Sequence, residues 1–392
     1  MAKHPPISRT VAAVQTPIIP VVAEWTRNTP GTLSLGQGMV SYPPPAAALH
    51  AIAEFGGAAS DHLYGPALGH PDLLALIHAK LHQENNIDCA NGYRVMVTAG
   101  SNMAFMNVLR VLVDPGDEVI LPVPYYFNQE MAVRMLNCTP VSVATDAHYQ
   151  LQLDALRAAI TEKTRAIVTV SPNNPSGAVY SEASLRAVNQ LCKDHGLYHI
   201  SDEAYEYFTY SAAQHFSPAS IDDAQGHTIA LYSLSKAYGF ASWRIGYMVF
   251  PEALLPDLLK VQDTQLICPP QITQLAAIGA LQTGSAYCRQ QLRALADIRQ
   301  QLLGPLQSHP IVSTVATDGA FYLLLKVATR LDDLHLVNTL IRDFKVAVIP
   351  GSAFGLYEGC YLRVSYGMLD AKNAQLALQR LLKGLDWVAG LG

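Results

Sequence analysis

The sequence contains few charged residues and no concentration of charge of either sign. Only 15% of its 392 residues are Asp, Glu, Lys or Arg, and the formal net charge is −5, with a pI near 6.2. The Lys and Arg residues are scattered and form no basic run. We therefore expect neither a nucleic acid nor an anionic membrane surface as a partner, because both attract clustered positive charge.

Cysteine is scarce, and long hydrophobic runs are absent. The six cysteines form no CxxC pair and no Cys/His cluster with zinc spacing, so we expect no metal site and no redox motif. Buried free thiols are typical of a reducing compartment. Polar residues and prolines between Gln15 and Pro20 interrupt the apolar N-terminal stretch, which leaves neither a signal peptide nor a membrane span. These features predict a cytoplasmic protein.

Hydrophobic residues nevertheless make up half of the chain. Such a chain buries extensive surface, in two domains or in one large and one small domain. From about residue 70 to residue 285, helical patterns such as 71–85 and 181–196 alternate with short, nearly continuous apolar runs. This alternation predicts an α/β domain with a mostly parallel sheet that is covered on both faces. The expected strands are 94–97, 118–122, 166–170, 197–201, 228–233 and 244–250.

A different pattern begins near residue 290 and predicts a smaller α+β unit. Its expected elements are a helix, three strands and a terminal helix, over 291–307, 319–327, 345–351, 361–367 and 373–388. The first 45 or so residues are rich in proline and lack a strong helical period, so we expect them to join this unit or to brace an interface. The expected division is an N-terminal segment, a large domain and a small domain, over 1–45, 46–285 and 286–392.

One lysine stands among hydroxyls, glycines and aromatics in the stretch SLSKAYGFASWRIGY, residues 233–247. Lys236 follows directly from an expected strand, and ligands bind at the carboxyl ends of strands in α/β sheets. A solvated lysine is more often found among other charges on a helix face. Two interpretations compete: a lysine that happens to lie near a turn, and a lysine that bonds covalently to a ligand.

Four other segments place polar or glycine residues just past, or within, an apolar strand. Gly100 and Ser101 open a helix, where backbone N–H groups suit a phosphate, although many turns contain small residues. Asn174 lies past a strand, in a segment that is either part of a ligand site or an ordinary Asn-Pro turn. Asp202 ends a strand, where it either caps a helix or needs a cation or hydrogen-bond donors. Arg363 lies within a strand and needs an anion, either a ligand carboxylate or a structural salt bridge.

Together these residues indicate one ligand with a phosphate, a protonated ring nitrogen and a carbonyl that condenses with an amine. Pyridoxal 5′-phosphate has all three groups. Lys236 would hold its aldehyde as a Schiff base, and Asp202 would keep the pyridine nitrogen protonated, so that the ring accepts electrons. This hypothesis favours the covalent role for Lys236.

The lysine segment resembles the signature of class I and II aminotransferases, the fold-type I enzymes that use pyridoxal 5′-phosphate. The resemblance extends over nearly the whole chain, through LSLGQGMVSYPPP, YGPALGHPDLL, TAGSNMA, NNPSG, SDEAY, PGSAFG and LRVSYG. It implies a seven-stranded, mostly parallel sheet between helices, a smaller α+β domain, and a homodimer with active sites at the subunit interface. It also implies transfer of an amino group from an L-amino acid to a 2-oxo acid.

The resemblance further implies a role for each matching residue. Lys236 holds the cofactor and then serves as the base for proton transfer, and Asp202 pairs with the pyridine nitrogen. Tyr205 and Asn174 hydrogen-bond the ring hydroxyl oxygen, and Tyr126 stacks on the ring. The residues implied around the phosphate are Gly100, Ser101, Asn102, Ser233 and Arg244.

Substrate binding is implied for Arg363, which would clamp the α-carboxylate with help from Asn174 and the backbone of Gly38. Tyr64 would reach the phosphate of the neighbouring subunit. No basic residue stands between Lys260 and Arg289, so we expect an apolar pocket for the substrate side chain. The segments expected to line this pocket supply Met39, Val40, Tyr42 and Ile267.

The segments GQGMVSYPPP, VPYYFNQEM, YEYF and VQD most resemble the branch of the family that uses aromatic amino acids, methionine and kynurenine. An aspartate aminotransferase is an alternative, with its cation supplied by Arg110, Arg134 or a partner-chain residue. A β-lyase acting on cysteine conjugates, or an enzyme that closes an aminocyclopropane ring, would have the same Lys236 and Asp202. A non-enzymic regulator would need an appended DNA-binding module, which the roughly 30 residues before LSLGQG are too few to form.

Overall fold

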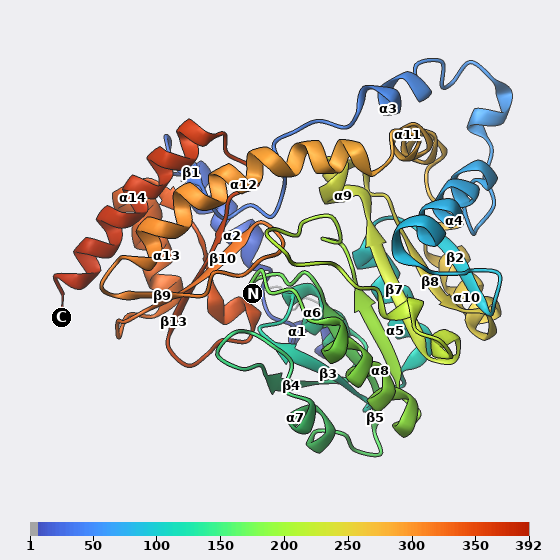
Figure 1. Cartoon of the computed structure of the whole chain (residues 1–392), viewed down its shortest axis with the longest axis horizontal. Coiled ribbons are helices and arrows are strands. Elements are labelled where there is room, and N and C mark those ends of the chain that lie inside the picture. The colour runs from blue at the N-terminus through green and yellow to red at the C-terminus, as the bar shows by residue number, and fades with distance from the viewer. Residues whose placement is uncertain (1–6, 392) are drawn as a thin grey trace, which may run out of the picture.

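A seven-stranded sheet is the largest element of the computed structural model, which describes residues 7–391 (Figure 1). Its strands are β2 (Tyr93–Thr98), β3 (Glu118–Val123), β4 (Thr139–Ala144), β5 (Thr164–Val170), β6 (Tyr198–Asp202), β7 (Thr228–Ser233) and β8 (Gly246–Pro251). Their order in the sheet is β2-β8-β7-β6-β5-β3-β4. All neighbouring pairs from β7 to β4 are parallel, and β8 runs antiparallel to both β7 and β2. The predicted α/β fold with a mostly parallel sheet is confirmed.

Helices cover both faces of this sheet because its strands are apolar on both sides. Met96 and Met248 pack with α5 (Ser101–Leu112) and α10 (Leu255–Leu266), whereas Val97 and Val249 belong to the cluster that contains α4 (Pro71–Asn85) and α11 (Gln271–Gln282). All four side chains are fully buried, and each such burial stabilises the fold by about 1.5–3 kcal/mol. The remaining helices of this part are α3 (Ala46–Ala51), α6 (Phe127–Met135), α7 (Leu153–Ala158), α8 (Glu182–His195) and α9 (Leu234–Ala237).

A smaller, four-stranded sheet contains the C-terminal part of the chain. Its strands pair antiparallel in the order β12 (Ile349–Pro350), β13 (Cys360–Ser365), β10 (Tyr322–Val327) and β9 (Val312–Thr314). Three helices lie with this sheet in Figure 1, namely α12 (Ser285–Gln307), α13 (Asp333–Phe344) and α14 (Ala371–Ala389). The separation of the two sheets supports the boundary predicted near residue 285, which we keep as a proposal.

Most of the N-terminal segment lies against the helices and strands of the smaller sheet. The short α1 (Arg9–Ala12) contacts α6 of the larger part, but α2 (Ile18–Arg27) packs on α13, and β1 (Leu33–Ser34) forms a parallel pair with β11 (Val346–Ala347). We expected no strong helix before residue 45. α2 forms nonetheless because Pro20 lies in its first turn, where a missing N–H removes no helical hydrogen bond.

Several strand predictions were incomplete or wrong, and the short strands β1 and β9 were not predicted. β4 escapes detection because it lies at the edge of the sheet and buries only Val143 along its length. The strand expected over 244–250 begins at Gly246, because Arg244 adopts a left-handed backbone conformation (φ 52°). The run 345–351 divides at Val348 into β11 and β12, which pair with different partners, β1 and β13.

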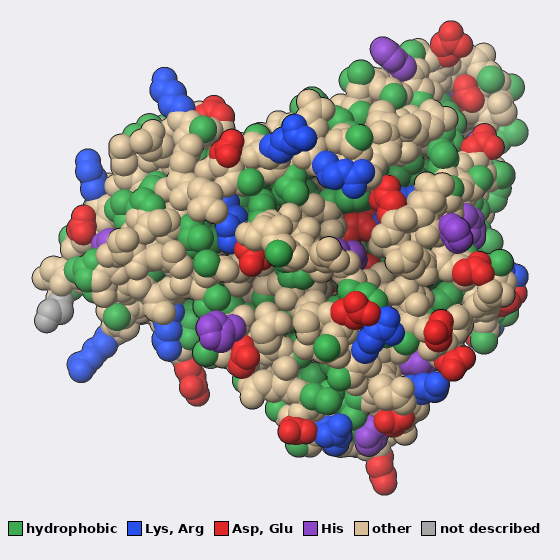
Figure 2. Space-filling view, in the orientation of Figure 1, with side chains coloured by type: hydrophobic (Ala, Val, Ile, Leu, Met, Phe, Trp, Pro, Cys, Tyr) green, Lys and Arg blue, Asp and Glu red, His purple; other side chains and the backbone are tan. Residues whose placement is uncertain are grey.

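Charged side chains are dispersed over the surface. On the face shown in Figure 2, Lys and Arg are interspersed with Asp and Glu. Within residues 7–391, none of the helices combines the length and the apolar character needed to span a bilayer.

Gly177 provides a test of how the two sheets are held together. Its φ is +75°, and a Cβ there would lie 2.5 Å from Thr317 Oγ1 and 2.9 Å from the carbonyl oxygen of Tyr322. We expect Gly177→Ala to lower the free energy of unfolding by about 1–3 kcal/mol, because the left-handed conformation and the close backbone contact both oppose a side chain. Urea denaturation measures the loss.

The control is Gly226→Ala, since a Cβ at Gly226 meets no atom within 4 Å. This variant should stay within about 0.5 kcal/mol of wild type. Equal stabilities for the two variants would show that the Gly177 turn tolerates a side chain.

Candidate active site

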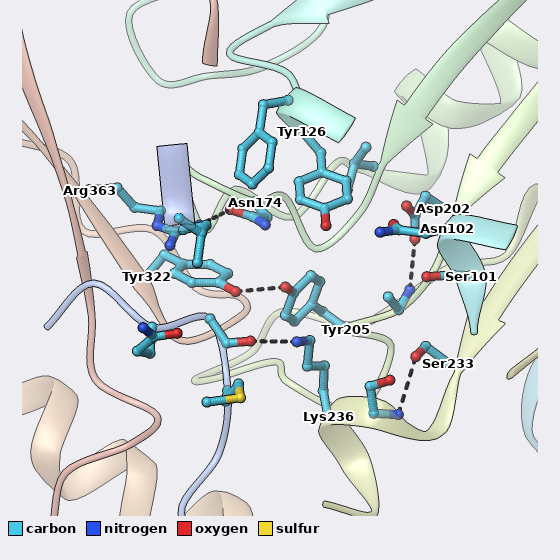
Figure 3. Close-up of a pocket in the computed structure, with 18 of the residues that line it drawn as sticks. Ser101, Asn102, Tyr126, Asn174, Asp202, Tyr205, Ser233, Lys236, Tyr322 and Arg363 are labelled. Carbon is cyan, nitrogen blue, oxygen red and sulfur yellow. Dashed lines mark hydrogen bonds between the residues drawn. The ribbon is translucent and has the colours of Figure 1, made fainter. Parts of the chain in front are cut away.

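A cavity of about 260 Å³ lies where the ends of the large sheet's strands meet the smaller sheet. Lys236 and Tyr126 occupy facing walls, and Arg363 and Asp202 lie on opposite sides (Figure 3). The predicted site residues that line it are Gly38, Ser101, Asn102, Tyr126, Asn174, Asp202, Tyr205, Ser233, Lys236, Arg244 and Arg363. The structure therefore brings together residues that are up to 325 positions apart in the sequence.

Parallel strand order explains why these side chains meet. β5, β6 and β7 are neighbours that run in one direction, so their carboxyl ends lie at one edge of the sheet. Asn174 follows β5, Asp202 ends β6 and Ser233 ends β7. Asn173, the neighbour of Asn174, instead forms hydrogen bonds within its own loop and to Pro124.

Lys236 lies in the short helix α9, directly after β7. Its Nζ donates a hydrogen bond to the carbonyl oxygen of Gly38. Burial and, to a smaller extent, the positive charges of Arg363 and Arg244 lower the pKa of Lys236 to about 8, against an opposing effect of Asp202. A larger fraction of this amine than of an ordinary lysine is therefore unprotonated near neutral pH, which makes it a better nucleophile toward carbonyl groups.

Asp202 is a buried carboxylate held by hydrogen bonds. Its Oδ2 accepts from Gln129 Nε2 at 2.9 Å, and its Oδ1 accepts from the backbone N–H of Ala204 at 3.2 Å. Burial raises the pKa of Asp202 to about 6. Among residues 7–391, no Lys, Arg or His forms an ion pair with it within 4 Å. Such a carboxylate stabilises a cationic group of a ligand, because that cation would be its first charged partner.

An anion-binding corner lies at the start of α5. Gly100 precedes the helix with φ +83°, so the first N–H groups of α5 point out of the helix beside Ser101. The Arg244 guanidinium lies against this turn, and a Cβ on Gly100 would be 2.6 Å from its Nη2. Arg244 Nη1 also lies 3.4 Å from Ser235 Oγ. A helix N-terminus, a guanidinium and several hydroxyls together suit a phosphate.

Arg363 is buried in the middle of β13, with 1% of its surface exposed. Its Nη1 donates to Asn174 Oδ1 at 2.9 Å and its Nη2 to the Gly36 carbonyl oxygen at 2.7 Å. Its Nε has no hydrogen-bond partner among the described residues. A guanidinium carries five N–H donors, so this arrangement fixes its plane and leaves donors for a carboxylate.

Sequence reasoning missed several residues of the site. Tyr322 lines the cavity, and its hydroxyl lies 2.6 Å from that of Tyr205 (Figure 3). Gln129 lies in α6, one helical turn after Tyr126, and donates a hydrogen bond to Asp202. In the sequence, only its polar side chain could have indicated this role. The other lining residues that were not predicted are Ile19, Gln37, Phe127, Val170, Ala204 and Ser235.

Other predicted residues lie outside the cavity. Of the four expected to line the apolar pocket, only Met39 does so. Tyr42 instead donates its hydroxyl to the backbone oxygen of Lys236, Val40 packs against the core, and Ile267 is 39% exposed at the end of α10. Tyr64 is 79% exposed and contributes nothing to this chain's own cavity.

The two arginines proposed as alternative cations also lie outside the cavity. Arg134 pairs with the buried Glu130 on its own helix, and Arg110 is exposed on α5. Among the described lining residues, the cations are therefore Lys236, Arg244 and Arg363.

Comparison with known proteins identifies the family. The profile of the family described as aminotransferase class I and II matches residues 30–381. The chain belongs to this family. It is 34% identical to an aromatic aminotransferase of Arabidopsis thaliana, over 97% of this chain and 96% of the relative, and 33% identical to an aspartate aminotransferase of Pyrococcus abyssi, over 82% and 84%.

Solved structures agree with the family assignment. An aspartate aminotransferase of Thermus thermophilus with maleate superposes with a TM-score of 0.89 at 29% identity, covering 97% of this chain and 100% of that one. The fold is therefore fold type I, and the chain is a transaminase of a family that depends on pyridoxal 5′-phosphate.

The lowered pKa of Lys236 has a consequence for stability. The unfolded chain keeps the ordinary pKa near 10.5, so the folded state carries the full penalty of a buried ammonium below pH 8 and loses that penalty as pH rises to 10.5. In protein prepared without cofactor, Lys236→Met should be more stable than wild type at pH 7 by roughly 2 kcal/mol, since the cavity leaves Nζ partly solvated. This advantage should shrink between pH 8 and 10.5.

Urea denaturation across this pH range measures the difference. Lys383→Met, at an exposed position of α14, is the control and should show no such trend. An advantage for Lys236→Met that stays constant with pH would mean that the lysine is not destabilised by its charge.

Proposed function

We propose that this transaminase transfers the amino group of an aromatic or methionine-like L-amino acid to a 2-oxo acid, with pyridoxal 5′-phosphate attached to Lys236. One observation carries the proposal: Lys236, with a lowered pKa, and Asp202, without a cationic partner within residues 7–391, line one cavity. The anion-binding corner and Arg363 lie in the same cavity and match the cofactor's phosphate and the substrate's carboxylate. When bound, the cofactor supplies an electron sink that stabilises negative charge on the substrate carbon.

Each residue then has a distinct task. Lys236 would bind the aldehyde and would afterwards move a proton to and from the substrate. Asp202 would hold the positive charge of the ring nitrogen, and its neighbour Gln129 fixes the carboxylate. Tyr205 and Asn174 would bind the ring oxygen. Gly100, Ser101, Asn102, Ser233 and Arg244 would hold the phosphate, Tyr126 the ring, and Arg363 with the backbone of Gly38 the substrate carboxylate.

The apolar lining supports an aromatic or methionine-like substrate. Ile19, Met39 and Phe127 contribute to the cavity wall. All three lining cations already have a task, so the described residues offer none for a second carboxylate. The relative from Arabidopsis thaliana is an aromatic aminotransferase. Aspartate is the second candidate, because the relative from Pyrococcus abyssi is an aspartate aminotransferase and a partner subunit can supply a cation.

We further propose a homodimer, in which the exposed Tyr64 reaches the phosphate of the neighbouring subunit. We also propose a cytoplasmic enzyme. All six cysteines are buried and unpaired, which supports the expected reducing compartment.

Covalent attachment can be tested by reduction with borohydride. After incubation with pyridoxal 5′-phosphate, wild type should carry a stable adduct on the peptide that contains Lys236, as measured by mass spectrometry. Lys236→Ala should fold but carry no adduct, because the nucleophile is gone. Lys260→Ala, which removes an exposed lysine, should retain it. An adduct trapped at another lysine would refute the assignment.

Substrate choice can be tested without knowing the acceptor. We expect kcat/KM to favour phenylalanine, tyrosine, tryptophan, kynurenine or methionine over aspartate by at least about tenfold, because an apolar side chain gains from burial and an unpaired carboxylate loses. Spectroscopy of the first half-reaction with each amino acid measures this ratio. Arg363→Leu should impair all amino acids alike. A preference for aspartate would point to a cation from the partner subunit.

A further inference from the structure

Tyr322 contacts both Tyr205 and Arg363 without belonging to any residue set assigned above. Its side chain is 1% exposed and lies at the start of β10. The hydroxyl lies 2.6 Å from the hydroxyl of Tyr205, and the ring centroid lies 4.6 Å from the Arg363 guanidinium carbon. Figure 3 shows the two hydroxyls pointing toward one another. Tyr322 therefore lies between the ring-oxygen site and the carboxylate site.

The register of the small sheet creates this position. Tyr322 is paired with Ser365 across the antiparallel strands β10 and β13, and Arg363 lies two residues before Ser365. Side chains two apart on a strand share a face, so Tyr322 and Arg363 are diagonal neighbours on the side of the sheet that faces the cavity. Phe354 covers the guanidinium as well, with its ring centroid 5.0 Å away. Aromatic rings thus hold the cation that the carboxylate would meet.

The backbone of Gly38 fixes the Tyr322 hydroxyl. A Cβ at Gly38 would lie 2.8 Å from Tyr322 Oη, so only glycine allows this approach. The carbonyl oxygen of the same glycine accepts the hydrogen bond from Lys236. The position of the hydroxyl is therefore set from one side by Gly38 and from the other by Tyr205.

We propose that Tyr322 is a positioning residue that directs the hydroxyl of Tyr205 toward the cofactor's ring oxygen and holds Arg363 for the substrate carboxylate. A hydroxyl has one proton. When Tyr205 donates that proton to the ring oxygen, its own oxygen is free to accept from Tyr322, and the two hydrogen bonds polarise each other. The Arg363 charge next to the Tyr322 ring makes Tyr322 a better donor. This inference rests on the proposed function, since it assigns Tyr205 to the ring oxygen.

The two roles of Tyr322 can be separated by two substitutions. Tyr322→Phe removes the hydroxyl and keeps the ring over Arg363, and Tyr322→Leu removes both. A hydrogen bond donated to the ring oxygen favours the deprotonated form of the bound cofactor. Loss of the Tyr322 hydroxyl should therefore raise the pKa of the bound cofactor, read from its visible absorbance, by on the order of half a unit.

The measurement is a spectrophotometric pH titration of the resting enzyme, without substrate. Tyr205→Phe should raise the same pKa by more, and Tyr322→Phe added to Tyr205→Phe should raise it no further, because the effect passes through Tyr205. Tyr322→Phe should leave the KM for amino acids within about twofold of wild type, whereas Tyr322→Leu should raise it roughly tenfold through loss of the ring over Arg363.

Tyr366→Phe is the matched control. Tyr366 is equally buried in the segment that follows β13, and its hydroxyl bonds the Ala320 carbonyl oxygen at 3.3 Å. Its loss should not move the titration. Circular dichroism and thermal unfolding check that each variant folds. If Tyr322→Leu does not fold, the nearly isosteric Tyr322→Phe still tests the role of the hydroxyl.

The outcomes are distinct. The proposed action through Tyr205 would be overturned if Tyr322→Phe left the pKa of the bound cofactor unchanged. It would also be overturned if Tyr322→Phe raised this pKa as much in the Tyr205→Phe variant as in wild type. An unchanged KM in a folded Tyr322→Leu would overturn the support of Arg363. If wild type binds no cofactor at Lys236, the visible absorbance itself is missing, and the proposed function fails instead.

Discussion

Positive charge that the protein does not neutralise is the constraint on which the site depends. Lys236, Arg244 and Arg363 line one cavity, and Asp202 is the carboxylate among the described residues that line it. Both arginines contribute to the lowered pKa of Lys236, because like charges disfavour protonation. Bound phosphate and carboxylate groups relieve this repulsion. The same charges that activate the lysine therefore make the cavity selective for anionic ligands.

A loop from the N-terminal segment connects the parts that carry these charges. The Gly36 and Gly38 carbonyl oxygens accept hydrogen bonds from Arg363 in β13 of the smaller sheet and from Lys236 in α9, which follows β7 of the larger sheet. Ser365 fixes the loop through its N–H to Leu35 and its hydroxyl to the Gln37 carbonyl oxygen. Both cations thus share one short stretch of backbone, so a shift of this loop alters the lysine and the carboxylate site together.

The sequence predicted those site residues whose positions in the fold follow from the order of parallel strands. Residues just past β5, β6 and β7 had to meet, because parallel neighbours end at one edge, and Asp202 and Lys236 were found on that ground. Tyr322 was not, since its proximity to Arg363, 41 residues further along the chain, depends on the register of an antiparallel strand pair. Nothing along the chain marks that register. The prediction of the residues that line the substrate side-chain pocket failed for a related reason. The Tyr42 hydroxyl donates a hydrogen bond to the backbone oxygen of Lys236, and the apolar character of a residue does not show which way its side chain points.

The two ends of the cavity are built differently, and this difference bears on substrate choice. The end proposed to hold the cofactor depends on neighbouring strand ends in one sheet, so a change there disturbs the fold itself. The end proposed to hold the substrate side chain is assembled from α2, the loop around Met39 and the first turn of α6, which contribute Ile19, Met39 and Phe127. The side chains at these three positions can vary while the backbone of the loop keeps Lys236 and Arg363 in place. Relatives of about equal identity to this chain, one an aromatic and the other an aspartate aminotransferase, are what such a construction leads us to expect.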